Sequence, residues 1–272
     1  NTNGALIMDT PAIENAVFAL MQNRLKPGPF KSLPAQCKPS GLNEAYDLQE
    51  ALNKALTKAG LGPQVGHKVG CTSKVMQDYM KIPHPCSGSI FQSTVHSLGV
   101  SQPSNLYHQV GVECEIAVRL AKDLPSSREP YTQSSVFDSV ESCMSAIEIV
   151  DNRYQDFRSL DLETMVADDF FQAACVLGEE IVEWQHLDLA EIAGRMMVNK
   201  IEVGNGKGAD ILGHPFEALA WLANHKVARG TFLCAGEIVL LGSLVKTQWL
   251  SPGDKAVVEL DHLGAVSAEF LA

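Results

Sequence analysis

The run Val112-Glu113-Cys114-Glu115-Ile116-Ala117-Val118 (VECEIAV) places two carboxylates, two residues apart, inside a pattern that is otherwise typical of a buried strand. Because side chains alternate along a strand, Glu113 and Glu115 are expected on one face. Two like charges on one face repel each other and lose hydration, so a cation is expected between them. A divalent metal with oxygen ligands suits this role. The alternative is an edge strand whose polar face meets water.

A third carboxylate stands in a similar setting in the segment 145–151 (SAIEIVD), where Glu148 lies among Ile and Val. An unpaired charge in such surroundings costs several kcal/mol, so Glu148 needs a partner. Three inward carboxylates would form an oxygen-ligand site suited to magnesium, manganese or calcium. The alternative is an ion pair of Glu148 with Arg153 or Lys68.

Lys68 is the third feature, within the glycine-flanked segment 66–73 (GHKVGCTS). A desolvated lysine near a metal can have a pKa that falls toward neutrality, which would make it a competent proton shuttle. The alternative is an exposed turn residue. Gly66 and Gly70 match neither the Walker nor the dinucleotide-binding glycine pattern, so a phosphate site is not predicted.

Strand-like runs rich in Val, Ile and Ala dominate the sequence from about residue 109. Strands are predicted at 113–120, 146–150, 173–177, 237–245, 255–260 and 265–270, the last two joined by a turn at 261–264. Residues 195–203 are predicted to form a strand that enters a hairpin turn at 204–208, because Asn-Gly adopts positive φ easily. A helix is predicted over 215–228, with His214 as a capping or packing residue.

The N-terminal third has helical periodicity. Helices are predicted at 13–25 and 42–59, the second ended by Gly60 and Gly62, followed by a strand at 64–71, a short helix at 73–80 and a loop at 81–89. The chain therefore divides into a small helical part, residues 8–85, and an α+β domain, residues 86–272, with a mostly antiparallel or mixed sheet. Residues 1–7 lack an initiating Met and the order of a secretory signal, and are expected to be a processed start or a cloning remnant.

Composition narrows the class of protein. The 272 residues (29.4 kDa) are 46% hydrophobic and 19% charged, which is typical of a globular protein. The formal charge is 21 − 32 = −11, so nucleic acid and anionic membrane surfaces are poor partners. Apolar runs stay well short of the ~20 residues that a bilayer span needs.

The seven cysteines indicate a reducing compartment, and we expect the cytoplasm. They are odd in number, spread along the chain and contain no CxxC pair, so neither a zinc site nor a disulfide framework is predicted. Cys71 and Cys86 lack an obvious histidine partner, which makes a thiolate nucleophile a minor option.

Six segments resemble, in order, the 2-keto-4-pentenoate hydratase and 4-oxalocrotonate decarboxylase group of the fumarylacetoacetate hydrolase superfamily. They lie between about residues 42 and 270 and comprise 66–73 (GHKVGCTS), 112–117 (VECEIA), 146–153 (AIEIVDNR), 212–224 (LGHPFEALAWLAN), 235–244 (AGEIVLLGSL) and 250–254 (LSPGD). The resemblance implies that residues 86–272 form a mixed β-sheet roll or sandwich, and that the protein is a homo-oligomer, alone or complexed with a related family enzyme.

The resemblance also implies residue roles. Glu113, Glu115 and Glu148 would bind Mg²⁺ or Mn²⁺, with Ca²⁺ as a further option, and Lys68 would be the acid/base residue. The substrate is expected to meet His67, Thr72, Ser73, Cys86, Asp168 and Ser243. Two segments depart from the family pattern. Cys86 stands where many hydratases carry a carboxylate, and bulky Phe170 and Phe171 stand where they carry small residues.

The function implied is that of a metal-dependent lyase, a hydratase that adds water to an unsaturated 2-oxo or 2-hydroxy acid such as 2-hydroxypenta-2,4-dienoate. Decarboxylation of a 2-oxo diacid such as 4-oxalocrotonate is the second expectation, because it passes through the same kind of dienolate, and hydrolytic cleavage of an acylpyruvate is the third. A non-catalytic subunit that keeps the fold is the rival from another class.

Overall fold

The strand that carries Glu113 and Glu115 lies inside a sheet, not at its edge. It is β5 (Val110–Leu120), paired on one side with β10 (Ile238–Ser243) and on the other with β6 (Val140–Asp151). The structure, a computed structural model, describes residues 8–272. The edge-strand alternative for the two glutamates is therefore wrong.

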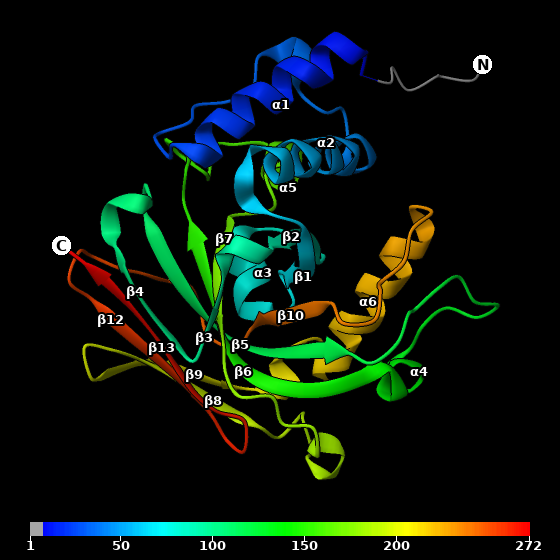
Figure 1. The fold of residues 1–272 in the computed structure, drawn as a ribbon, viewed down its shortest axis with the longest axis vertical. Coiled ribbons are helices and arrows are strands. Elements are labelled where there is room, and N and C mark those ends of the chain that lie inside the picture. Colours follow the sequence, from blue (N-terminus) through cyan, green and yellow to red (C-terminus); the bar gives the residue numbers. More distant parts are fainter. Residues whose placement is uncertain (1–7) are drawn as a thin grey trace.

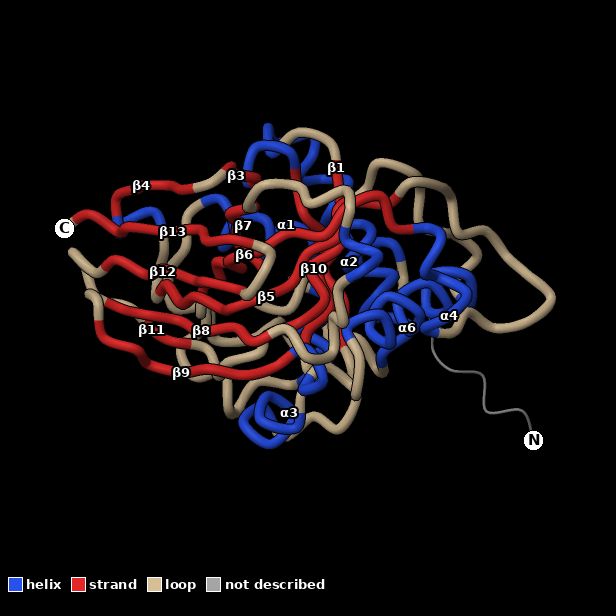
Figure 2. The backbone as a smooth tube through the Cα atoms, turned by 90° about the horizontal axis from the view of Figure 1, so that it is seen from below, coloured by secondary structure: helices blue, strands red, loops and turns tan. Residues whose placement is uncertain are grey.

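Two mixed sheets contain the strands (Figures 1 and 2). The remaining strands are β1 (Gln64–Gly70), β2 (Cys86–Phe91), β3 (Val95–Ser97), β4 (Gly99–Pro103), β7 (Gln172–Leu177), β8 (Ala193–Val198), β9 (Ile201–Lys207), β11 (Gln248–Trp249), β12 (Lys255–Leu260) and β13 (Gly264–Leu271). The eight-stranded sheet has the order β2-β1-β10-β5-β6-β7-β3, with β11 paired to β5, and the five-stranded sheet has the order β4-β13-β12-β8-β9. The mixed sheets confirm the predicted α+β class.

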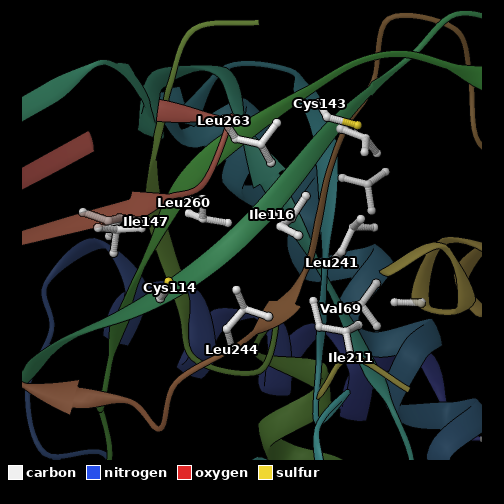
Figure 3. Packing of buried hydrophobic residues seen from close by; sticks show 14 of the residues in the cluster. Val69, Cys114, Ile116, Cys143, Ile147, Ile211, Leu241, Leu244, Leu260 and Leu263 are labelled. Carbon is white, nitrogen blue, oxygen red and sulfur yellow. The ribbon is translucent and has the colours of Figure 1, made fainter. Parts of the chain in front are cut away.

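The largest core lies between the two sheets. Figure 3 shows Cys114 and Ile116 of β5 among Leu244, Leu260 and Leu263, all of them buried. Because residues alternate along β5, this packing turns the neighbouring glutamates to the opposite face of the sheet. The sandwich core thus fixes which face can carry the charged site.

The α-helices among residues 8–272 lie outside the two sheets. They are α1 (Thr10–Leu25), α2 (Leu42–Leu56), α3 (Lys74–Met80), α4 (Gln133–Val136), α5 (Leu162–Ala167) and α6 (Pro215–Ala228). Figure 1 shows α1, α2 and α5 grouped at one end, while α6 lies beside β10. Among the helices of residues 8–272, none combines the length and the apolar character that crossing a lipid bilayer requires.

Most predicted elements are present with shifted ends. Helices 13–25, 42–59, 73–80 and 215–228 correspond to α1, α2, α3 and α6, and His214 caps α6 by accepting a hydrogen bond from the Phe216 N–H at 3.0 Å. The predicted loop 81–89 is partly wrong, because β2 begins at Cys86. The expectation about residues 1–7 concerns residues outside those described. The division at residue 85 stays a prediction, although β1 lies within the main sheet between β2 and β10.

The predicted hairpin turn at 204–208 is wrong. The turn is Asn199-Lys200, both with positive φ (52° and 71°). Gly204 and Gly206 lie within β9, and Gly208 follows it. A Cβ on Gly204 would lie 2.2 Å from Val245 Cγ1, and one on Gly206 would lie 2.3 Å from the Leu244 carbonyl oxygen. These glycines therefore permit the close approach of a neighbouring segment and do not supply a turn.

Candidate active site

The three predicted glutamates converge on one face of the eight-stranded sheet. Glu113 on β5 lies directly opposite Glu148 on β6, and Glu115 follows on the same face of β5. One carboxylate oxygen from each lies within 4.8 Å of the others. Glu115 and Glu148 are fully buried and Glu113 is 8% exposed. Three acidic groups are thus held together out of water, which is costly unless a cation joins them.

Several oxygens of this cluster lack partners among residues 8–272. Neither Oε1 of Glu115 nor Oε2 of Glu148 accepts a hydrogen bond, whereas Glu115 Oε2 accepts one from the Gly242 N–H at 3.0 Å. Glu113 accepts a hydrogen bond from the Thr247 hydroxyl. Orphaned carboxylate oxygens, close together and buried, form the donor set that a hard divalent cation binds, so the residues fit such an ion.

Burial and, after it, mutual repulsion raise the pKa values of two of the glutamates. Burial and the neighbouring Glu148 raise the pKa of Glu113 to about 7. Burial, Glu148 and Glu113 raise the pKa of Glu115 well above its ordinary value. A divalent cation among the three carboxylates would favour their charged forms and oppose this shift.

Lys68 reaches the same cluster from β1. Its Nζ lies 3.0 Å from Glu148 Oε1, and the residue is 2% exposed. Burial alone would lower the pKa of Lys68, but the carboxylates of Glu148 and Glu113 outweigh burial and raise it. The predicted fall toward neutrality concerns a lysine beside a bound metal ion, and it stays a prediction. Lys68 is buried, so the alternative that it is an exposed turn residue is wrong. The ion pair considered for Glu148 is present, with Lys68 and not with Arg153.

A narrow cavity with about 30 Å³ of free space adjoins this cluster. Its polar wall contains Lys68, Glu113, Ser243 and Thr247, and its apolar wall includes Met76, Tyr79, Met80, Phe170, Phe171 and Trp249. Charged groups and apolar side chains around one space suit a small acid with a carbon tail.

Ser243 and Thr72 lie near the glutamates. Ser243 borders the cavity, and its hydroxyl donates to the Val245 carbonyl. Thr72 packs on Gly242, where a Cβ would lie 1.7 Å from Thr72 Oγ1, and that hydroxyl has no partner among residues 8–272. Their predicted contact with substrate stays a prediction.

His67 and Ser73 have other surroundings. His67 alternates with Lys68 along β1 and faces the opposite side, where its Nε2 lies 3.4 Å from Glu237 Oε2. Ser73 accepts a hydrogen bond from the Met76 N–H and caps α3. Neither residue lines the cavity, so direct substrate contact by either is not supported.

Asp168 and Cys86 are likewise fully buried away from the cavity wall. Asp168 accepts hydrogen bonds from the Tyr154 hydroxyl at 2.7 Å and from Arg153 at 3.1 Å, and it pairs with Arg24 at 3.1 Å. With its carboxylate occupied in this way, Asp168 holds the backbone in place. The predicted contact of Asp168 and of Cys86 with the substrate stays a prediction.

Sequence reasoning missed Thr247 and the α3 side chains. Thr247 precedes β11, a two-residue strand that pairs with Val112 and Gly111 of β5, and this pairing brings its hydroxyl to Glu113. No local pattern in the sequence reveals so short a strand. Met76 and Tyr79 could have been found from the spacing of apolar residues on α3, because three residues place them on one face of a helix.

Known proteins are similar in sequence to most of this chain. It matches the family described as fumarylacetoacetate (FAA) hydrolase C-terminal over residues 70–271. It is 34% identical to the 2-keto-4-pentenoate hydratase of Burkholderia vietnamiensis over 226 residues, which is 83% of this chain and 85% of that protein. It is 30% identical to the 4-oxalocrotonate decarboxylase of Pseudomonas putida over 229 residues, which is 84% of this chain and 85% of that protein.

A solved structure shares the fold. It is a 4-oxalocrotonate decarboxylase from Pseudomonas putida, complexed with magnesium and adipate, which matches with a TM-score of 0.87 at 24% identity and covers 96% of this chain and 97% of that chain. The family match spans the glutamates on β5 and β6 and the segments that carry the apolar wall. On this evidence the chain belongs to the fumarylacetoacetate hydrolase family.

Proposed function

We propose that the chain is a divalent-metal-dependent hydratase that adds water to an unsaturated 2-oxo or 2-hydroxy acid such as 2-hydroxypenta-2,4-dienoate. The observation that carries this proposal is the buried cluster of Glu113, Glu115 and Glu148 with Lys68 paired to it. Several relatives, matched over most of their length, are named 2-keto-4-pentenoate hydratase, and their names support the same reaction.

The three glutamates would hold Mg²⁺ or Mn²⁺, with Ca²⁺ as a further candidate. When bound, such an ion supplies Lewis acidity, which stabilises negative charge on the oxygens of a chelating 2-oxo acid. Three carboxylate ligands favour hard cations over zinc, because zinc prefers nitrogen and sulfur ligands.

Lys68 moves the proton in this proposal. Hydration of an alkene conjugated with the 2-oxo group adds a hydroxyl to one carbon and a proton to the other, and consumes one water. Lys68 Nζ lies beside the cluster and faces the cavity, so it can give or take that proton at a carbon of the bound acid. Thr247 orients Glu113, and the apolar wall limits the access of further water.

Decarboxylation of a diacid is the second candidate. The relative named 4-oxalocrotonate decarboxylase covers as much of the chain as several of the hydratases do. Loss of CO₂ from a vinylogous 2-oxo diacid leaves the same kind of dienolate, so the same glutamates and Lys68 would serve. A family subunit without activity remains the rival class.

We also propose that the chain forms a homo-oligomer, or associates with a related enzyme of its family, in the cytoplasm. Ile201 and Val203 are exposed apolar side chains on β9, an edge strand that could be covered by another subunit. All seven cysteines are free and six are buried, which suits a reducing compartment.

The test of the proposed function follows the absorbance of a dienoate in the presence of Mg²⁺. We expect magnesium-dependent loss of the absorbance by the purified protein, and loss of both turnover and metal retention in Glu113→Ala. Glu141→Ala, an exposed glutamate on β6, is the matched control and should behave as the unaltered protein. Turnover that persists in excess chelator would contradict the proposal.

A further inference from the structure

Three consecutive residues beside the cavity have a strained backbone. Asp169, Phe170 and Phe171 all have left-handed φ values, 55°, 48° and 68°. Residues other than glycine rarely adopt this conformation singly, and three in succession persist only where the surroundings enforce them. Strained backbone of this kind is typical of sites where a side chain is held in one orientation.

Buried polar contacts hold the turn in place. The Asp169 carboxylate accepts a hydrogen bond from the Ser89 N–H at 2.9 Å and one from Asn53 at 3.2 Å, and it pairs with Arg24 at 3.2 Å. The Asp169 carbonyl oxygen lies so close to β2 that a Cβ on Gly88 would be 2.5 Å from it. The turn is therefore fixed from both sides.

The turn presents the ring of Phe170 to Lys68. Lys68 Nζ lies 5.1 Å from the ring centroid, within range of a cation–π contact. The ring also packs on β1, where a Cβ on Gly70 would lie 3.0 Å from it. Phe171 supports Phe170 edge to face at 5.5 Å. The acid/base lysine thus has a fixed aromatic surface on one side.

Apart from Lys68 and Glu113, the residues that line the cavity carry no charge. Met76, Tyr79, Met80 and Trp249 are among its apolar and aromatic members, and Lys68 is the sole cation that lines it. Lys246 and Arg158 are exposed and contact the Tyr79 ring, at 4.3 Å and 5.7 Å from its centroid. Neither of them lines the cavity.

We propose that the uncharged wall of the cavity, of which Phe170 and Phe171 form a part, determines substrate specificity, so that the site takes a 2-hydroxydienoic or 2-oxo acid with a short uncharged tail and rejects a dicarboxylic acid. The inference rests on the proposed function, because the acid end must first bind at the glutamates. A carboxylate on the tail would lose its hydration and would be surrounded by aromatic rings and thioethers, with no free cation to pair with. This transfer is strongly unfavourable. An alkyl tail would instead displace flexible side chains such as Met76 and Met80.

The experiment compares two six-carbon substrates that differ only at the tail. These are 2-hydroxyhexa-2,4-dienoate, which ends in a methyl group, and 2-hydroxyhexa-2,4-dienedioate, which ends in a carboxylate. We expect kcat/KM with Mg²⁺ to favour the methyl compound by about 100-fold, the size of effect that an unpaired buried charge produces. Met80→Lys adds a cation to the wall and should raise the ratio of dioate to monoate turnover by about 10-fold. Val75→Lys adds the same charge on the exposed side of α3 and should leave that ratio unchanged.

A binding measurement keeps the inference separate from the proposed function. Calorimetry on the Mg²⁺-loaded protein compares 2-oxohexanoate with 2-oxoadipate, which are saturated and need no turnover. Tighter binding of 2-oxohexanoate supports the inference even if no dienoate is turned over, a result that would remove only the proposed function. Equal or tighter binding of 2-oxoadipate, or equal turnover of the two dienoates, would overturn the inference.

Discussion

Lys68 and Glu148 form a buried ion pair, in which each charge is compensated by the other. The pair lies 3.0 Å apart with both residues almost wholly buried, so either charge alone would be left uncompensated. Phe170 shields the lysine from one side at 5.1 Å. At the scale of single residues, the site holds three carboxylates and one ammonium group, and the excess of negative charge favours a bound cation.

Lys68→Met removes the proton carrier and leaves the glutamates intact. We expect kcat/KM for a dienoate to fall by about 10²–10⁴-fold, the usual contribution of a positioned acid or base. Binding of Mg²⁺, followed by calorimetry, should persist, because the lysine competes with a cation for Glu148 and does not ligate it. Full turnover by Lys68→Met would assign the proton transfer to another group.

At the scale of elements, the register between β5 and β6 brings the glutamates together, because it places Glu113 opposite Glu148. Alternation along β5 was sufficient to predict that Glu113 and Glu115 share a face, and the apolar neighbours of Glu148 predicted its burial. Which strands pair could not be predicted, because the partners β5 and β10 are separated by more than a hundred residues. Local patterns also misassigned the glycines of β9, since their cause is a contact with residues 244 and 245 and not a turn.

Gly206→Ala tests that interpretation of β9. The added Cβ would lie 2.3 Å from the Leu244 carbonyl oxygen, which is backbone and cannot rotate away. We expect the free energy of unfolding to fall by about 1–3 kcal/mol, as for other overpacked positions, in a urea titration. Asn205→Ala, at the neighbouring exposed residue, should change it by less than about 0.5 kcal/mol. Equal stability of Gly206→Ala and the unaltered protein would show that the strand moves freely.

At the scale of the whole molecule, the cavity is built from segments far apart in the sequence. Lys68 comes from β1, Tyr79 from α3, Glu113 from β5, Phe170 from the turn before β7, and Thr247 from the segment before β11. Motifs quoted from the sequence predicted the charged residues of this cavity. Its apolar residues and the supporting role of Asp168 could not be predicted, because they depend on how the helices fold back onto the sheet.

We propose that Glu113, Glu115 and Glu148 together bind one divalent cation. This can be tested by calorimetric titration of Mg²⁺ and Mn²⁺ into the unaltered protein, Glu148→Gln and Glu141→Gln. We expect one site in the unaltered protein and in Glu141→Gln, and loss of that site in Glu148→Gln, with a matching loss of the stabilisation against unfolding that a bound ion provides. Binding by Glu148→Gln with the affinity of the unaltered protein would contradict it.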